Sequence, residues 1–575
     1  MRTHSMLFLV LVALLSIFDH CLAAFVSIDC GSSVPITDEF GVKWTADDGY
    51  VQTGELQTVE YSSTIPSYMS ETVMSSLRVF PNLKKNCYTI NVNKGEKVLV
   101  RASFIYGNYD GKLAPPTFEL QFDGNFWSTV NTSELSGVYP EALYVMKENT
   151  TSICLAQTFP NQIPFISALE LRSLDSDMYS RVDPNLALFF SNRVASGAKQ
   201  TTRYPDDIYD RIWTPEVGFG GLSESMESVA VSIDTTTTED KPPLAVLLNA
   251  VGTTGRAWGL GLTTNLPNTN VPVYIATYFS EVAQLNLTDK RSIRILVDKI
   301  PYGTPVIPPF GSVSVVEITN MTASSSTNFD IAAASDSTLP PIINAYEVYT
   351  VSNALTDGTN RHDVEGLEAL RKEFDLLKSW SGDPCLPSRY TWEWLDCNTD
   401  ASPRVTALNL SSFGLSGSLP DFSSLDALET IDLHNNSIHG PIPNFLGSLP
   451  NLKLLILEDN RFNGTIPSSI SKNKKLTLII TNNCLSGMSC KPETLPSPTK
   501  SPLPVTPSSG TSDTPKSLTP PSGTSDIPEP LTPPSDQQDQ NQIPFFNGGK
   551  KSDTIPIVLG LTFQVSLLLL LLRQP

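Results

Sequence analysis

A repeat of 23 to 24 residues constrains the fold of this chain more than any other feature of its sequence. Two markers recur in register: an apolar pair flanking one variable residue and, further on, an apolar residue followed by proline. The pairs are Leu408-x-Leu410, Ile431-x-Leu433 and Leu455-x-Leu457, the proline markers are Leu419-Pro420, Ile442-Pro443 and Ile466-Pro467, and a partial fourth copy holds Leu478-x-Ile480. A unit this short cannot bury its apolar face alone, so successive copies must stack into one core.

The stacked copies predict a short leucine-rich repeat solenoid over 405–490, in which each copy contributes a strand. Asn436 and Asn460 occupy the asparagine position that follows each strand, whereas the first copy has Phe413 there. In strands of this kind the variable residue between the two apolar ones points to the concave face, which is the usual binding surface of a solenoid.

The ends of a solenoid need caps. We expect the N-terminal cap over 362–400, with a helix followed by a local disulfide between Cys385 and Cys397. The helix is predicted from apolar residues at helical spacing, namely Val364, Leu367, Leu370, Phe374 and Leu377. A second local disulfide, between Cys484 and Cys490, is predicted to close the other end.

The N-terminus predicts secretion. Arg2 precedes an unbroken apolar stretch, Met6 to Leu15, and small residues follow at Ala23 and Ala24. This is the layout of a signal peptide over 1–23, with an apolar stretch too short to cross a membrane. The mature chain is therefore expected to begin near Ala24 or Phe25.

Secretion makes the cysteines disulfide candidates before metal ligands. No CxxC pair occurs and the five histidines form no ligand-like cluster, so we expect no metal and no cofactor. Three further cysteines, Cys30, Cys87 and Cys154, leave one thiol unassigned, and the sequence does not decide which two pair.

Charge and glycosylation signals agree with an extracellular protein. The net charge of −20 excludes nucleic acid and anionic lipid as favoured partners, because both would repel the chain, but a basic peptide or a neutral glycan would not be repelled. Candidate N-glycosylation sites occur at Asn131, Asn149, Asn286, Asn320, Asn409, Asn435 and Asn463.

The segment before the cap predicts a mainly β fold. Short β-branched and aromatic runs separated by turn residues extend from 25 to 350, which is typical of sandwiches or barrels. That length exceeds the usual size of one domain, so we expect two β lobes, over about 25–180 and 200–350.

Eight motifs in this segment resemble the plant malectin-like domain. They are Phe25-Val-Ser-Ile-Asp-Cys-Gly31, Trp44-Thr-Ala-Asp-Asp-Gly-Tyr50, Arg78-Val-Phe-Pro with Asn86-Cys-Tyr-Thr89, Tyr106-Gly-Asn-Tyr-Asp-Gly111, Pro164-Phe-Ile-Ser-Ala-Leu-Glu-Leu171, Arg203-Tyr-Pro-Asp-Asp-Ile-Tyr-Asp-Arg-Ile-Trp213, Tyr278-Phe-Ser-Glu281 and Leu339-Pro-Pro-Ile-Ile-Asn-Ala-Tyr346. The following Gly382-Asp-Pro-Cys385 resembles the junction between malectin-like and leucine-rich repeat regions in plant receptor-like kinases.

The resemblance implies two tandem malectin-type β-sandwiches and a role in recognition. Relatives in plants are linked to cell-wall polysaccharides and secreted peptides, and animal malectin binds a glucose disaccharide in an aromatic-lined loop pocket. Carried over to this chain, the sugar site would comprise Tyr106, Tyr109 and Asp110, since aromatic faces stack on sugars and a carboxylate accepts hydroxyl hydrogen bonds. The alternative is that the two tyrosines pack a strand and its turn.

No enzyme is expected. The sequence has no GxSxG, HExxH, phosphate-loop or kinase motif. The adjacent acids Asp47-Asp48 and Asp206-Asp207 could suggest a glycosidase, but neighbours on a strand point to opposite faces and do not share a cleft.

The C-terminal part predicts a stalk and a membrane anchor. Residues 491–553 are rich in Pro, Ser and Thr, which is typical of an extended stalk. The apolar run 555–572 is about 27 Å long as a helix, enough to cross a bilayer. It is either a transmembrane helix or the tail of a glycosylphosphatidylinositol signal, and Lys550 and Lys551 before the run favour the lipid anchor, attached at Asn547 or Ser552.

These expectations combine into one functional hypothesis. The protein would lie on the extracellular face of the plasma membrane as a receptor-like protein without catalytic activity, binding a wall glycan or a secreted peptide. Because only three residues follow Leu572, a receptor kinase in the same membrane is the expected partner. The alternative is a carbohydrate-binding module that tethers the membrane to the wall without signalling.

Overall fold

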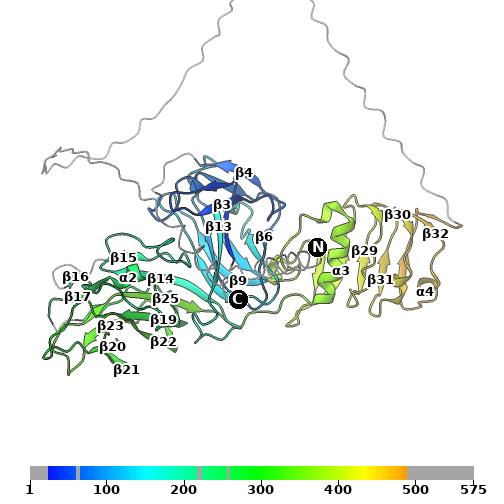
Figure 1. The fold of residues 1–575 in the computed structure, drawn as a ribbon. Helices are drawn as coiled ribbons and strands as arrows, with labels where there is room; N and C mark the ends of the chain where they lie inside the picture. Colours follow the sequence, from blue (N-terminus) through cyan, green and yellow to red (C-terminus); the bar gives the residue numbers. More distant parts are fainter. Residues whose placement is uncertain (1–23, 60–64, 217–222, 256–258, 488–575) are drawn as a thin grey trace, which may run out of the picture. The chain divides into compact units, whose positions relative to one another are not determined.

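The computed structural model describes residues 24–59, 65–216, 223–255 and 259–487 (Figure 1). The predicted signal peptide, the stalk and the apolar tail with its attachment candidates Asn547 and Ser552 lie outside these ranges, as does Cys490. Within the described ranges, none of the helices has the length and apolar character needed to cross a bilayer.

The N-terminal β lobe, here lobe 1, holds the first thirteen strands. They are β1 (Phe25–Asp29), β2 (Ile36–Thr37), β3 (Lys43–Ala46), β4 (Glu55–Thr58), β5 (Ser76–Val79), β6 (Lys85–Asn91), β7 (Lys97–Ser103), β8 (Thr117–Phe122), β9 (Asn125–Asn131), β10 (Glu141–Val145), β11 (Thr150–Ala156), β12 (Phe165–Ile166) and β13 (Ala168–Leu174), with a 3₁₀ turn at Val73–Ser75. Sheets β6-β11-β8-β9 and β12-β5-β4 belong to this lobe alone.

The second β lobe, lobe 2, holds the next twelve. They are β14 (Leu188–Ser196), β15 (Thr214–Glu216), β16 (Ser223–Glu227), β17 (Asn249–Thr253), β18 (Leu260–Gly261), β19 (Val271–Phe279), β20 (Ile293–Val297), β21 (Ile300–Val306), β22 (Ser314–Ala323), β23 (Phe329–Ala333), β24 (Ile342–Ile343) and β25 (Ala345–Val351), with the short helix α2 (Leu244–Leu247). Its own sheets are β18-β23-β20-β21 and β16-β17-β24.

One sheet runs through both lobes. Its order is β2-β3-β1-β13-β7-β10-β14-β25-β19-β22, with β15 paired to β14. The lobes meet where β10 pairs antiparallel with β14, through Ala142 opposite Phe189 and Leu143 opposite Leu188. The two sandwiches predicted from the sequence are therefore joined edge to edge by backbone pairing.

The two faces of this shared sheet have different partners, because successive residues of a strand point to opposite sides. On β7, Val98, Val100 and Ala102 enter the core of lobe 1, whereas Leu99 points to the other face. On β25, Tyr346 and Val348 enter the core of lobe 2. Residues from the segment between β13 and β17 cover the remaining face, among them Met178, Tyr179, Trp213, Val246 and Leu247. Both faces of the sheet are thus buried.

The cap and the solenoid follow. Their elements are α3 (Arg361–Glu373), 3₁₀ turns at Asp375–Leu377, Ser388–Tyr390 and Asn444–Ser448, β26 (Leu395–Cys397), β27 (Val405–Asn409), β28 (Ser416–Ser418), β29 (Thr430–Asp432), β30 (Ser437–Pro441), β31 (Leu454–Ile456), β32 (Arg461–Gly464), α4 (Ser468–Ser471), β33 (Thr477–Ile479) and β34 (Cys484–Leu485). Strands β27, β29, β31 and β33 pair in parallel, and β28, β30, β32 and β34 form a second sheet.

The predicted cap helix is α3, with two differences from the apolar pattern. Asn360 caps the helix through its side chain, which accepts from the His362 amide, and Leu367 and Leu370 are buried. Phe374 and Leu377 lie beyond the end of the helix, and Val364 is 39% exposed. Val364 therefore does not join the solenoid core, although its spacing fits.

Asparagine side chains connect successive repeats. Asn460 Oδ1 accepts from the Ile438 amide at 3.0 Å, and its amide group donates to the carbonyls of Leu433 and Leu457. Asn436 and Asn483 make the equivalent bonds one copy away on either side. The asparagine of the pattern thus satisfies backbone groups that the turn leaves unpaired inside the solenoid.

Two disulfides are resolved among the described residues. The predicted partners Cys385 and Cys397 are bonded in the cap, and Cys87 of β6 is bonded to Cys154 of β11. The structure thus leaves Cys30 as a buried free thiol. Cys484 is disulfide-bonded, while its predicted partner lies outside the described residues.

The Gly382-Asp-Pro-Cys385 junction packs against lobe 1 at the Cys87–Cys154 disulfide. Gly382 has a left-handed φ of 73°, and a Cβ there would overlap the two sulfur atoms. Lys85 Nζ donates to the carbonyls of Asp383 and Leu386, at 2.6 and 3.0 Å. Burial lowers the pKa of Lys85 to about 8, although Asp383 partly opposes that shift. These contacts connect lobe 1 to the cap directly.

Replacing Asn460 with alanine should destabilise the solenoid. The Ile438 amide and the carbonyls beneath it would lose their partner in a site where Asn460 is only 4% exposed, at a cost of about 1–3 kcal/mol. Asn444→Ala, at an exposed position, is the matched control and should unfold like the wild type in urea. Equal stability of the two variants would contradict this role for the asparagine.

Candidate functional site

The structure brings the three predicted sugar-site residues together in the loop after β7. Tyr106 is buried at 1% exposure, and its hydroxyl donates to Asp110 Oδ1 at 2.6 Å and accepts from the Ala114 amide. Burial and the bond to Asp110 raise the pKa of Tyr106 to about 12. The Tyr106 side chain therefore shapes the loop and is not itself offered to a ligand.

Of the three predicted residues, Tyr109 and Asp110 are the partly accessible ones. The Tyr109 ring is half-buried and packs on Phe165, with ring centroids 5.4 Å apart. The Asp110 carboxylate is 20% exposed and lies 3.1 Å from Lys112 Nζ. This surface, the Tyr109–Asp110 loop, combines one aromatic ring with a hydrogen-bond acceptor, which suits contact with a sugar.

The two pairs of adjacent acids do not form catalytic clefts. Asp47 is buried and accepts from Arg78 at 2.6 Å and from the Tyr88 hydroxyl at 3.0 Å, whereas the Asp48 side chain is 72% exposed. Asp207 is likewise buried and bonded to Arg211 and to Trp213 Nε1, both at 2.8 Å, and Asp206 is exposed. One acid of each pair is therefore occupied by structural hydrogen bonds.

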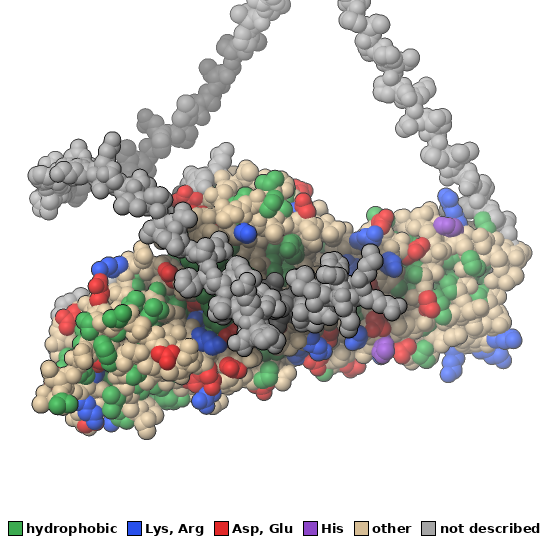
Figure 2. Space-filling view, viewed as in Figure 1, with side chains coloured by type: hydrophobic (Ala, Val, Ile, Leu, Met, Phe, Trp, Pro, Cys, Tyr) green, Lys and Arg blue, Asp and Glu red, His purple; other side chains and the backbone are tan. Residues whose placement is uncertain are grey.

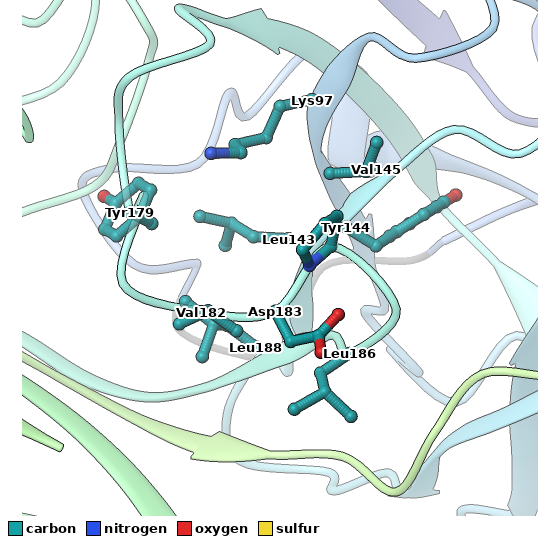
Figure 3. A pocket seen from close by; sticks show the side chains of 10 residues that line it. Lys97, Leu143, Tyr144, Val145, Tyr179, Val182, Asp183, Leu186 and Leu188 are labelled. Carbon is teal, nitrogen blue, oxygen red and sulfur yellow. The ribbon is translucent and has the colours of Figure 1, made fainter. Parts of the chain in front are cut away.

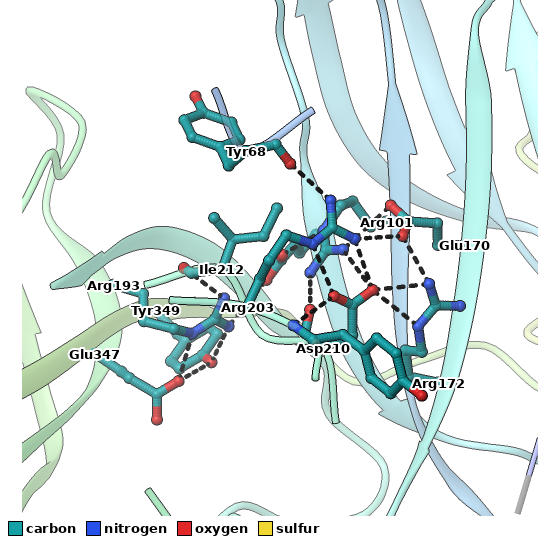
Figure 4. Close-up of polar contacts among 12 residues, drawn as sticks. Tyr68, Arg101, Glu170, Arg172, Arg193, Arg203, Asp210, Ile212, Glu347 and Tyr349 are labelled. Carbon is teal, nitrogen blue, oxygen red and sulfur yellow. Dashed lines mark hydrogen bonds and ion pairs between the residues drawn. The ribbon is translucent and has the colours of Figure 1, made fainter. Parts of the chain in front are cut away.

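A group of titratable residues forms a buried ion-pair network on the face of the shared sheet that the segment between β13 and β17 covers (Figure 4). On the lobe 1 side, Asp210 is the hub: its carboxylate lies 2.8 Å from Arg172, 2.9 Å from Arg203 and 3.4 Å from Arg101. Glu170 pairs with the same three guanidinium groups. Strands β7 and β13 and the loop that carries Arg203 and Asp210 are thereby held together.

The network then crosses from one lobe to the other. Glu141 of β10 binds Arg101 at 2.7 Å and Arg193 of β14 at 2.9 Å. Arg193 continues to Glu347 of β25 at 2.7 Å and to the Tyr349 hydroxyl at 2.8 Å. The side chains thus cross at the point where only two residue pairs of backbone join the lobes.

The arginines lower the pKa values of these acids. Burial raises the pKa of Glu141, but Arg193 and Arg101 outweigh it and hold the pKa below the ordinary value. Glu347 behaves in the same way beside Arg193 and Arg211, and the pKa of Asp210 is also lowered by its three arginines against the effect of burial. A general acid of a hydrolase would instead need a raised pKa.

A small cavity lies beside the joint between the lobes (Figure 3). Its volume is about 20 Å³, and Leu143, Val182 and Leu188 are among the side chains that line it. Lys97 Nζ donates to the Ser176 and Met178 carbonyls beside it, and burial lowers the pKa of this lysine. The cavity can hold about one water molecule and is too small for an organic ligand.

The surface is mixed in charge and accessible at the predicted glycosylation sites. In the view of Figure 2, acidic and basic side chains are interspersed over the face. All seven candidate asparagines are exposed: Asn131, Asn149, Asn286, Asn320, Asn409, Asn435 and Asn463. Asn409 lies on β27, at the variable position of the first repeat.

Sequence reasoning did not find the ion-pair network. Single charges inside otherwise apolar strands, such as Arg101 within Val-Leu-Val-Arg-Ala-Ser, were the available signal. The motif Arg203 to Trp213 carries part of the family resemblance, and in the structure it supplies Arg203, Asp207, Asp210 and Arg211 to the buried charges. The sequence pattern could not show that the loop carrying Asp210 packs against β7 and β13.

The family follows from comparison with known proteins. Residues 28–351 match the model of the malectin-like domain, and 427–449 and 451–473 match leucine-rich repeats. This chain belongs to the malectin-like family and joins that region to leucine-rich repeats.

Two relatives from Arabidopsis thaliana illustrate the similarity. A probable LRR receptor-like serine/threonine-protein kinase is 35% identical over 422 residues, which cover 71% of this chain and 48% of that protein. An uncharacterized protein is 36% identical over 343 residues, covering 59% of this chain and 67% of its own length. The chain spans about half the length of the receptor-like kinases it matches.

A solved structure agrees on the fold. The ANX2 ectodomain of Arabidopsis thaliana superposes with a TM-score of 0.51 and 16% identity, covering 57% of this chain and 97% of that one. At this identity the likeness supports a common fold and no more.

Removing Arg193 should destabilise the protein strongly. Arg193→Met would leave Glu141 and Glu347 buried with fewer cations, a change that typically costs about 3–5 kcal/mol. Lys199→Met, which breaks an exposed pair with Glu227, is the matched control. Thermal unfolding should show a large drop in Tm for the first variant and none for the second, and similar Tm values would refute the importance of the network.

Stability should pass through a maximum in mildly acidic solution. Burial raises the pKa of Asp29 to about 7 and those of Asp123 and Asp240 to about 6, so the folded state takes up protons there and gains stability as pH falls through 7 and 6. The lowered pKa values of Glu141, Glu347 and Asp210 act in the opposite sense. Their stabilisation is lost once the unfolded chain is protonated, below about pH 4.5.

Chemical unfolding across pH 3 to 8, a range set by the ordinary and raised carboxyl pKa values, measures this curve. Asp240→Asn should flatten its neutral limb, because that acid would no longer take up a proton on folding. A curve that rises steadily from pH 5 to 8 would contradict the assignment.

Proposed function

We propose that this protein is a non-catalytic cell-surface receptor-like protein that binds a cell-wall glycan or a secreted peptide through its malectin-like region and acts with a receptor kinase. The observation that carries the proposal is the similarity to receptor-like kinases over a stretch that includes both the malectin-like region and the repeats. The names of those relatives describe receptors, and a kinase partner would connect this chain to the same kind of signalling.

The geometry of the described residues supports recognition more than catalysis. The buried acids of the ion-pair network are held by arginines, and the Tyr109–Asp110 loop is an accessible group with ligand-binding character. A sugar would stack on the free part of the Tyr109 ring and donate a hydroxyl hydrogen bond to Asp110. Tyr106 would keep both side chains in place through its bond to Asp110.

The location we propose is the extracellular face of the plasma membrane, with the chain held by a lipid anchor or a helix at 555–572. Exposure of every candidate glycosylation site fits passage through the secretory pathway. Release of the protein from membranes by a phosphatidylinositol-specific phospholipase would establish the lipid anchor, and persistence after treatment would favour the helix.

Glycan binding should depend on the Tyr109–Asp110 loop. Tyr109→Ala and Asp110→Asn should each weaken binding of wall oligosaccharides to the purified full-length protein by about tenfold, a loss of about 1.4 kcal/mol. Phe159→Ala is the control, because Phe159 is an aromatic residue of the same lobe that is 67% exposed. Calorimetry that shows tight glycan binding unaffected by both loop variants would exclude this site.

The second candidate function is wall tethering without signalling. It is favoured by the same loop, since one ring and one carboxylate suffice for a weak structural contact with polysaccharide. Co-purification from membranes separates the two. A receptor kinase in the complex supports the receptor-like role, and wall polysaccharide alone supports tethering.

A further inference from the structure

A groove runs between lobe 1 and the cap helix α3. Val145, Leu355, Val364 and Ala369 contribute apolar groups to its lining, and we call it the junction groove. Its volume is about 690 Å³, within the range of pockets that hold organic ligands, and it lies at an interface between domains, where such pockets are frequent. Val364 is the cap-helix residue that the solenoid core leaves exposed, and the groove is where it points.

The two walls of the groove are fixed to each other. Lys147 Nζ from the turn after β10 donates to the carbonyls of Leu355 and Thr356, at 2.9 and 3.1 Å, and pairs with Asp357. The Asn125 side chain accepts from the Thr356 amide at 2.9 Å. Together with the bonds of Lys85 to the junction, these contacts form the groove before any ligand arrives, which reduces the entropy that binding would cost.

The groove carries an excess of negative charge. Six acids line it, Asp123, Glu148, Asp357, Glu365, Glu368 and Asp383, against the three bases Lys147, Arg361 and Lys372. Glu365 and Glu368 on α3 are 55% and 63% exposed; Glu365 pairs with Arg361, which is 83% exposed, and Glu368 pairs with Arg371, which is 22% exposed. The exposed pair of Glu365 is weak, and the exposed side of the Glu368 carboxylate remains open to a cationic ligand.

The lining favours a peptide over a sugar. The two aromatic side chains at the groove, Phe122 and Tyr144, are buried at 1% and 3% exposure and offer no ring face for stacking. The accessible apolar groups are aliphatic, and they suit side chains such as Leu or Val. Apolar groups beside exposed acids match a segment in which apolar residues alternate with Lys or Arg.

We propose that the junction groove binds a short basic peptide segment, with an aliphatic side chain against Val364 and Leu355 and a Lys or Arg side chain at Glu365 and Glu368. This site is separate from the Tyr109–Asp110 loop. It deepens the proposed function and rests on it, because it names one ligand class for the receptor-like role.

The test uses fluorescein-labelled ten-residue peptides and the purified full-length protein. One peptide alternates Leu or Val with Lys or Arg, a second has Glu and Asp in place of the bases, and a third contains Lys and Ser only. We expect saturable anisotropy with the first alone. Glu365→Lys with Glu368→Lys should weaken it at least tenfold, and Val364→Ser, which removes the apolar contact without adding charge, should also weaken it.

Two controls separate the groove from general attraction to an acidic protein. Glu55→Lys with Glu224→Lys changes the net charge equally at exposed positions on β4 and β16 and should leave the affinity unchanged. Tm values within a few degrees of the wild type would show that the groove variants fold. An equal loss in both double variants, or equal binding of the Lys–Ser peptide, would overturn the proposal.

The glycan expected at Asn149, which also lines the groove, provides a further outcome. If the basic peptide binds Asn149→Gln but not the glycosylated protein, the glycan fills the groove and the proposal is wrong. If no peptide of the panel binds while glycans bind through Tyr109, the groove proposal fails and the proposed function stands. If the wild-type protein binds neither the peptides nor the glycans, both the groove proposal and the proposed function are rejected.

Discussion

Five buried guanidinium groups and five carboxylates lie against one face of the sheet that both lobes share, and the joint between the lobes depends on their pairing. An ion buried alone would be very costly, so each arginine requires its acid to be present at the right distance. Arg193 and Glu141 impose this condition across the joint, where only two residue pairs of backbone connect β10 to β14. The charges therefore specify how the two lobes meet, while the apolar side chains around them supply the burial.

The cap and the solenoid depend on a different constraint, the pairing of backbone groups in a narrow stack. Asn436, Asn460 and Asn483 satisfy the amides and carbonyls that each turn leaves inside. The junction at Gly382 then attaches the cap to the disulfide of lobe 1, which requires the absence of a side chain there. Because Gly382 and Lys85 fix the junction against lobe 1, the groove between lobe 1 and α3 has a fixed shape. That is a condition for selective binding.

Much of the fold could be predicted from the sequence. Periods of 23 to 24 residues placed the repeats, helical spacing placed α3, and short β-branched runs indicated two mainly β lobes. The candidate site was only partly predictable. Tyr106, Tyr109 and Asp110 do lie together, but Tyr106 is buried and only its two neighbours are accessible. A pattern of residue types cannot say which ring of a turn faces the solvent, because that depends on Phe165, which is remote in sequence.

The sequence alone determined that a mainly β region is followed by leucine-rich repeats, since periodicity and turn residues are local properties that a single chain displays directly. Only the tertiary structure decided which cysteines of lobe 1 pair, how Arg101, Glu141, Arg193 and Glu347 combine, and why Val364 is exposed. The physical reason is the same in each case. The partners lie far apart in the chain, and the free energy of a buried charge or an apolar group is fixed by the neighbours that folding brings to it.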